Sequence, residues 1–292
     1  MTSKLKIQLL LILAGVVVTG LLCFMPRQKS DVIGSAVAQN EVSHEGHDHA
    51  EGEEHGHMTD EYANRLDSAD LEQIAALESK ANQVADVNTK LELYDSLISF
   101  SIKRNVPPMV AKFTERKAEV DPTETNYMLA GDNYFKAFRL SKQKPKELIQ
   151  GAINNYKKVI ELNPENLQAQ TAIGVANVEG SSALGVMPMK GIGILKDVLN
   201  KDPKNVNALT NLGYFAIQSG QYEKAIERFE TALSIDPNNA EAYIYLTDVY
   251  LSQSDVKKGI ETLEKYKSLV DDPLVKQQVN DYIKEIKNKN NS

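Results

Sequence analysis

The feature that most constrains this chain is a pattern that recurs after 34 residues. Asp202-Pro203 and Asp236-Pro237 are separated by this distance, and each pair ends one helical pattern and precedes Asn-containing turn residues and another helix. Periods of about 20–50 residues are typical of repeat architectures, in which each unit buries its apolar face only against its neighbours. The chain is therefore expected to stack small helical units instead of folding around one central core.

Small and apolar residues recur at helical spacings between the two Asp-Pro pairs. They comprise Leu209, Leu212 and Gly213 on a first helix, Gly220 and Tyr222 at the turn, and Ala225, Phe229 and Ala232 on a second helix, with Pro237 closing the unit. This spacing resembles the tetratricopeptide repeat (TPR) family. One position departs from it, because Ala216 stands where the family usually has Tyr. The resemblance implies an all-α fold: a solenoid of helix hairpins that winds as a right-handed superhelix.

The resemblance extends over four units in 122–272. The units after the first Asp-Pro pair are regular, and the two before it carry insertions, RLSKQKPK at 139–146 and GSSALGVMPMKG at 180–191. Residues 60–121 form a helical leading segment that is a possible degenerate repeat, and 273–292 form an amphipathic capping helix. No sustained alternation of apolar and polar residues indicates a sheet.

The two insertions carry residues that allow more than one interpretation. Lys142, Lys144 and Lys146 form a small basic run, which is either a solvated insertion or a contact for acidic lipids. Met187 and Met189 either pack within the second insertion or offer thioether sulfur to soft copper ions.

Residues 1–25 contain an apolar stretch at 7–25, flanked by Lys4 and Lys6 before it and by Arg27 and Lys29 after it. About 20 apolar residues are needed to span the hydrocarbon core of a bilayer, so the stretch is predicted to be a transmembrane anchor. The alternative is a signal peptide that is cleaved near Ala38.

Residues 26–59 are predicted to be a disordered, acidic, His-rich linker. All five His residues of the chain lie here, with six acidic and no basic residues between 39 and 59, so the segment cannot bury enough apolar surface to fold. Imidazole groups near carboxylates suit Zn²⁺, Ni²⁺ or Cu²⁺. The candidate ligands of a weak metal site are His44, His47, His49, His55 and His57. A hydrophilic spacer is the alternative.

The family resemblance implies a concave groove lined by one face of each first helix. The residues at these positions are Met128, Asp132 and Phe135; Val175; Asn207, Thr210, Tyr214 and Ile217; and Glu241, Ile244, Asp248 and Leu251. They are candidate contacts for a partner peptide or helix. The alternative is that some of these residues only pack between repeats.

Composition and charge exclude several classes of function. The net charge of −7 argues against a nucleic-acid binder, which needs a basic surface to neutralise phosphates. The predicted helical body has no His, and the single Cys lies within the apolar stretch, so Ser-His and Cys-His nucleophile systems are excluded there. No P-loop or dinucleotide motif is present. The chain is therefore not expected to be an enzyme, to hold a resident cofactor or to bind a small-molecule substrate.

These observations predict a non-catalytic scaffold for protein–protein interaction. Its anchor is expected in a bacterial inner membrane with the repeats in the periplasm, or the repeats are released there after cleavage. The resemblance to membrane-tethered TPR proteins suggests a role in assembling envelope complexes or cytochromes. The alternative function is a metal-handling accessory protein that uses its His-rich segment to bind Zn²⁺, Ni²⁺ or Cu²⁺.

Overall fold

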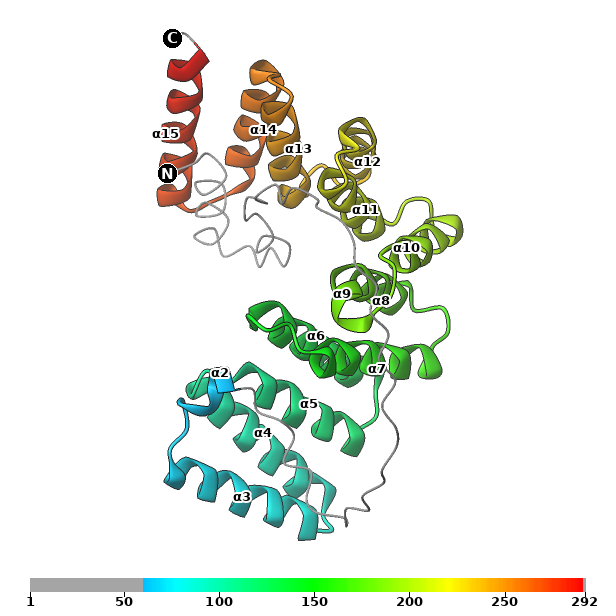
Figure 1. Ribbon diagram of the computed structural model, residues 1–292, viewed down its shortest axis with the longest axis vertical. Coiled ribbons are helices and arrows are strands. Elements are labelled where there is room, and N and C mark those ends of the chain that lie inside the picture. Colours follow the sequence, from blue (N-terminus) through cyan, green and yellow to red (C-terminus); the bar gives the residue numbers. More distant parts are fainter. Residues whose placement is uncertain (1–59, 291–292) are drawn as a thin grey trace, which may run out of the picture.

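In the computed structural model, the residues that can be described are 60–290, and every regular element among them is a helix. The helix pairs stack into an arc that runs from α3 at one end to α15 at the other (Figure 1). The all-α repeat architecture predicted from the sequence is thus confirmed. The predicted apolar stretch at 7–25 and the His-rich segment lie outside the described residues.

The leading part of the described chain contains four helices. They are α2 (Asp60–Ala63), α3 (Ser68–Gln83), α4 (Val87–Lys103) and α5 (Pro107–Val120). The turn between α4 and α5 has Asn105 at a φ of 55°, and the Val106 N–H donates to the Ser101 carbonyl at 3.0 Å. Asn tolerates this left-handed conformation better than most residues.

The repeat region continues the stack in hairpins. Its helices are α6 (Glu124–Leu140), α7 (Lys146–Leu162), α8 (Leu167–Glu179), α9 (Ser181–Leu184), α10 (Met189–Lys201), α11 (Val206–Gln218), α12 (Tyr222–Ile235), α13 (Ala240–Ser252) and α14 (Val256–Leu269). The helix α15 (Pro273–Asn290) follows and packs on α14. Its buried side chains Val275, Val279, Tyr282 and Ile283 join those of α13 and α14 in one apolar cluster.

The Asp-Pro signature acts at the junctions between units. The Asp236 N–H closes the preceding helix on the Ala232 carbonyl at 2.8 Å, while its carboxylate accepts from the Asn238 N–H at 3.0 Å. Asn239 then caps the next helix by accepting from the Ala242 N–H at 2.9 Å. Asn side chains are strong helix N-caps, and Pro cannot continue a helix. The junction after α10 repeats these bonds with Asp202 and Asn205.

Within a unit, the turn between the two helices needs a left-handed residue. Gly220 supplies it at a φ of 73°, and the following Gln221 N–H donates to the Ala216 carbonyl at 2.8 Å. The next unit places Ser254 at a φ of 64° in the same turn. Because a side chain at positive φ is strained, glycine suits this turn better than serine does.

The two helices of a unit approach closely where the first helix has glycine. A Cβ added at Gly213 would lie 2.7 Å from the Phe229 ring, and one at Gly131 would lie 2.4 Å from the Tyr156 ring. Phe229 and Tyr156 are fully buried by this contact. Glycine therefore sets the spacing of these two hairpins.

The first insertion is held in place by the helices around it. Lys144 Nζ donates to the Phe138 carbonyl at 3.1 Å and to the Arg139 carbonyl, which satisfies the end of α6. The Ser141 hydroxyl and the Lys142 N–H both donate to the Glu61 carboxylate, which docks α2 here. The prediction that this Lys run is a solvated insertion is therefore wrong for Lys144, which stabilises the end of α6.

The second insertion differs from its predicted packing. It forms the short helix α9, and Met187 and Met189, which follow this helix, are 73% and 59% exposed. A packed loop would have buried both side chains. The prediction was wrong for these two side chains, whereas Ala183 and Leu184 of α9 pack against the apolar cluster of α6, α7 and α8.

We expect Gly213→Ala to destabilise the protein by about 1–3 kcal/mol, because its methyl group would overpack the contact with Phe229. Gly193→Ala is the matched control, since a Cβ there meets nothing within 4 Å and Gly193 lies within α10. Alanine should stabilise that helix by up to about 1 kcal/mol. Urea unfolding midpoints measure both effects, and equal shifts would contradict the close contact.

Candidate functional site

The first helices of successive units form the inner face of the arc. Besides their partners within each hairpin, α8 contacts α11 and α11 contacts α13. Phe135 of α6 packs against the same apolar cluster as Val175 of α8 and Tyr214 of α11. Elements on the inner side of a curved stack lie closer together than those on its outer side, so we call the surface of α6, α8, α11 and α13 the inner face.

The predicted groove residues lie on these four helices with very different exposure. Asp132 and Asn207 are exposed, and the half-buried ones are Met128, Phe135, Glu241, Asp248 and Leu251. The buried ones are Val175, Thr210, Tyr214, Ile217 and Ile244. Seven of the twelve therefore retain surface that a partner could contact, whereas five contribute to packing between the units.

Tyr214 shows this packing role. Its ring centroid lies 5.2 Å from that of Tyr245, and the Tyr245 ring stacks on Phe229 at 5.4 Å. Aromatic pairs at these distances contribute beyond their buried area. The three rings join α11, α12 and α13, so a substitution at Tyr214 would test folding before it tested partner binding.

A largely buried ion pair ties α6 to α8 on the inner face. Arg139 Nε donates to Glu179 Oε2 at 2.8 Å, and its Nη2 donates to Oε1, which makes the pair bidentate. The two side chains are only 12% and 17% exposed. The guanidinium also lies 4.1 Å above the Phe135 ring, a favourable cation–π contact.

Two further carboxylates lie within the field of Arg139. Burial raises the pKa of Asp132 on α6, while the hydroxyl of Tyr156, which donates to it at 2.9 Å, and the charge of Arg139 lower that pKa. Burial likewise raises the pKa of Glu241 on α13, while the Tyr245 hydroxyl, which donates to it at 3.0 Å, and the charge of Arg139 lower it. We call Asp132, Arg139, Glu179 and Glu241 the inner-face cluster.

Two buried polar atoms of α6 and α11 have no hydrogen-bond partner among the described residues. They are Arg139 Nη1 and Thr210 Oγ1. Thr210 precedes Tyr214 by four residues, as Glu241 precedes Tyr245, and these two rings touch across the helices α11 and α13. Thr210 and Glu241 thus have the same spacing from these rings on α11 and α13. Buried polar groups without partners are costly, and the surface of both atoms is covered by the protein itself.

Sequence reasoning identified Asp132 and Glu241 but missed Arg139 and Glu179. The helical period could have indicated both residues. Arg139 is seven residues after Asp132, and Glu179 is four residues after Val175. Both spacings place the residue on the face already assigned to the groove. The pairing between α6 and α8 depends on how two hairpins pack, which spacing within one helix does not reveal.

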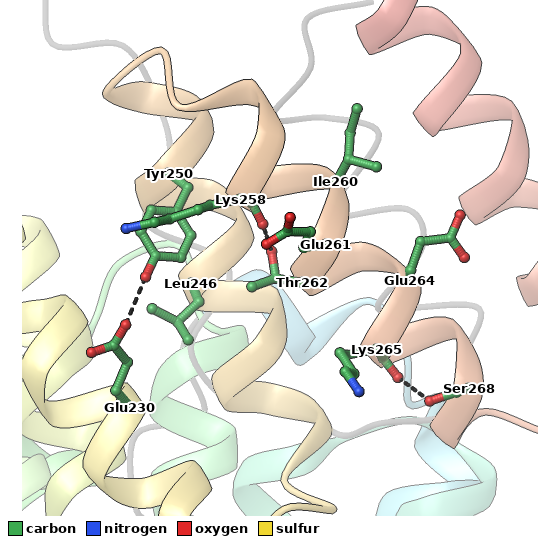
Figure 2. A pocket seen from close by; sticks show the side chains of 10 residues that line it. All are labelled: Glu230, Leu246, Tyr250, Lys258, Ile260, Glu261, Thr262, Glu264, Lys265 and Ser268. Atoms are coloured by element: carbon green, nitrogen blue, oxygen red, sulfur yellow. Dashed lines mark hydrogen bonds between the residues drawn. The ribbon is translucent and has the colours of Figure 1, made fainter.

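A second concavity lies between the second helices α12 and α14 (Figure 2). Its volume is about 720 Å³, and its lining comprises Glu230, Leu246, Tyr250, Lys258, Ile260, Glu261, Thr262, Glu264, Lys265 and Ser268. Several of its polar groups already have partners: Tyr250 donates to Glu230 at 2.9 Å, and Lys258 lies 5.0 Å above the Tyr250 ring. These polar groups of the cleft are therefore satisfied within the protein.

Within residues 60–290, no three His, Cys, Asp or Glu side chains gather in a way that could hold a metal ion. The predicted ligands His44, His47, His49, His55 and His57 lie outside the described part. None of the helices in the described part is long and apolar enough to cross a membrane.

We expect Arg139→Met to destabilise the protein by roughly 1–3 kcal/mol, because it leaves the Glu179 carboxylate buried without its partner. Lys158→Met is the matched control, since Lys158 and Glu161 form a surface pair with side chains 54% and 63% exposed. Removing that solvated surface pair should leave the stability almost unchanged. Thermal unfolding of both variants checks this, and a neutral Arg139→Met would refute a structural role for the pair.

The stacked hairpins and their shared inner face define an all-helical repeat protein. Two sequence models described as "Tetratricopeptide repeat" match the chain, one over residues 216–277 and the other over 194–227. Residues 194–277 are therefore tetratricopeptide repeats, as the 34-residue period predicted.

A curated relative is described as "BBSome complex member BBS4 homolog" from Drosophila melanogaster. It is 27% identical over 121 residues, which cover 41% of this chain and 24% of the relative. The match thus spans about a quarter of the length of that protein.

Solved structures with similar folds include TTC0263, a thermophilic TPR protein of Thermus thermophilus. It is 17% identical, covers 68% of this chain and 99% of its own, and has a TM-score of 0.49. MamA from Desulfovibrio magneticus is 19% identical over 61% of this chain and 94% of its own, with a TM-score of 0.42.

Proposed function

We propose that this protein is a non-catalytic scaffold that holds a polypeptide partner against its inner face. The observation that supports this most strongly is the inner face itself, where Arg139 of α6 pairs with Glu179 of α8 and seven of the predicted groove residues retain exposed surface. Curved helical solenoids offer such surfaces to extended peptides or helices. The curated relative is named as a member of a protein complex, which agrees with a role in assembly.

A site-specific crosslinking experiment tests this proposal. We expect a photo-crosslinking amino acid in place of Asn207, which is exposed on α11, to capture a partner in the native host. The same residue in place of Glu227, exposed on α12, is the matched control and should capture at most a fifth as much. Equal capture at both sites, or capture from α12 alone, would place the partner elsewhere.

We further propose that 7–25 anchor the chain in a bacterial inner membrane and that the repeats work in the periplasm, on envelope complexes or cytochrome assembly. The flanking charges and the single Cys within the apolar stretch support this orientation. Alkaline phosphatase fused after Ser292 should be active. An inactive fusion, with a fluorescent cytoplasmic reporter bright at the same site, would reverse the orientation. An intact mass that begins at Gln39 would show cleavage after Ala38.

A second candidate function rests on the His-rich segment, whose five imidazoles suit weak binding of Zn²⁺, Ni²⁺ or Cu²⁺. We expect a 39–59 peptide to bind Zn²⁺ at pH 7.5 and to lose affinity below about pH 6.5, because protonated imidazole cannot ligate a metal. Titration calorimetry measures this, with all five His replaced by Asn as the control. Heat that persists in the control would assign binding to the carboxylates, and no heat would leave only a spacer.

Deleting 40–58 from the full chain separates the two functions. A scaffold keeps its partner and phenotype without the segment, whereas a metal carrier loses its metal-dependent function. Retained partner capture with lost metal dependence would assign both functions to the chain.

A further inference from the structure

The second insertion presents two methionine residues to solvent. Met187 is 73% exposed and Met189 is 59% exposed, and Met187 is the most exposed of the large apolar residues within 60–290. The two are separated only by Pro188, at the point where α10 begins. Small reagents dissolved in the surrounding water can therefore reach both thioether side chains.

Hydrogen bonds hold the backbone on both sides of these residues. The Val186 N–H donates to the Ser181 carbonyl at 3.0 Å, and the Lys190 N–H donates to the Met187 carbonyl at 3.0 Å. Leu184 of α9 packs against the apolar cluster of α6, α7 and α8. The loop is thus attached to the repeats, and its attachment leaves the two Met side chains outside the core.

The other two methionines of the described part are packed. Met109 of α5 lies against the apolar cluster that includes side chains of α3 and α4, and Met128 of α6 lies against the cluster of α6, α7 and α8. Both residues are half-buried. Residues 60–290 therefore contain one exposed pair of Met and one packed pair, which serves as an internal control.

The thioether sulfur of Met reacts with two-electron oxidants such as hydrogen peroxide. A sulfur lone pair attacks one peroxide oxygen, so that an S–O bond forms and the O–O bond breaks. The attacked oxygen gives its proton to the departing hydroxide, which leaves as water. The sulfur is oxidised by two electrons and the peroxide is reduced, and the product is a polar sulfoxide.

We propose that Met187 and Met189 are a reversible oxidation site, at which peroxide converts each thioether to a sulfoxide while the repeats stay folded. This inference goes beyond the proposed scaffold function and does not depend on it. A methionine sulfoxide reductase reverses the reaction: the sulfoxide oxygen leaves as water, and two thiols of the reductant become a disulfide.

Oxidation at these two positions costs little packing. A sulfoxide within an apolar cluster would bury a polar oxygen without a hydrogen bond, which is costly. Met187 and Met189 face solvent, so water can solvate the new oxygen and the neighbouring clusters keep their contacts. The modification thus changes an apolar surface beside Lys190 into a polar one and leaves the fold intact.

Soft metal ions are the other reagents that thioethers attract. Residues 60–290 contain no His and no Cys, and Met109 and Met128 pack in the clusters of other helices. A copper ion on this loop would therefore have two sulfur ligands and no further soft ligand from the described residues. Oxidation needs only one accessible sulfur at a time, so the exposed pair favours this reaction.

Pulse oxidation of the full-length chain tests the proposal. The folded protein receives a short pulse of isotope-labelled hydrogen peroxide, free methionine quenches the pulse, and mass spectrometry of the digested chain measures the labelled sulfoxide at each Met. We expect Met187 and Met189 to oxidise at least about fivefold faster than Met109 and Met128. In concentrated urea the four rates should agree within about twofold, because packing no longer protects any of them.

Two outcomes of this pulse would overturn the site. One is an equal rate at all four Met of the folded chain, or faster oxidation of Met109 or Met128. The other is a rate difference that persists in urea, since the local sequence and not the fold would then be its cause.

The matching variant combines Met187→Leu with Met189→Leu, because leucine has a similar volume and cannot form a sulfoxide. After the same pulse, the wild-type chain should carry about two more oxygen atoms than this variant. Both proteins should keep the thermal midpoint of their untreated forms within about 2 °C. A treated wild-type chain that melts earlier than the treated variant would show that oxidation here damages the fold, against the proposal.

Reversibility has its own measurement. The two epimer-specific methionine sulfoxide reductases, supplied with a dithiol, should restore Met187 and Met189 in the folded, oxidised chain. Peptides from a digest of the same oxidised chain are the control for reductase activity. Sulfoxides that are reduced in the digest but not in the folded chain would contradict a reversible site.

Discussion

The contact between a glycine on one helix and a large side chain on the next sets the geometry of three successive hairpins. At Gly131 and Gly213 the ring of Tyr156 or Phe229 fills the space that a Cβ would need, and Gly174 gives Leu195 the same room. In these three hairpins the two helices thereby lie close together at the same level. Hydrophobic burial holds the units together, but the glycine positions decide how closely they approach.

This packing curves the stack, and the curvature brings polar side chains of different units together on the inner face. Helices α8, α11 and α13 are brought into contact along the stack, so their polar side chains lose water and meet groups from other units. The Arg139–Glu179 pair, which joins residues 40 positions apart, exists only because α6 and α8 are neighbours. Removing water strengthens such interactions and also makes unpaired groups costly, and both effects occur in this cluster.

Hydrogen bonds between α2 and the loop after α6 fix the start of the described chain. Glu61 accepts from Ser141 and Lys142 in the loop that follows α6, and Lys144 of that loop bonds the carbonyl of Arg139 itself. Glu61, near the start of the described chain, is thus bonded to Ser141, which follows Arg139 of the cluster by two residues in the sequence. If residues 1–59 tether the protein to a membrane, as proposed above, they join the folded part beside its candidate site.

The sequence alone determined the repeat unit, because its signals are local. Asp202 and Asp236 bond to their own helix ends, Asn205 and Asn239 cap the helices that follow, and Gly220 takes a left-handed turn, so each acts within a few residues. Only the tertiary structure decided which groove positions are buried, as Tyr214 is, and which carry charge beside a cation from another hairpin, as Glu241 does. Which positions are buried and which lie beside a charge depends on the angle between successive units. It arises from the packing of many side chains at once, which the spacing of residues along one helix does not contain.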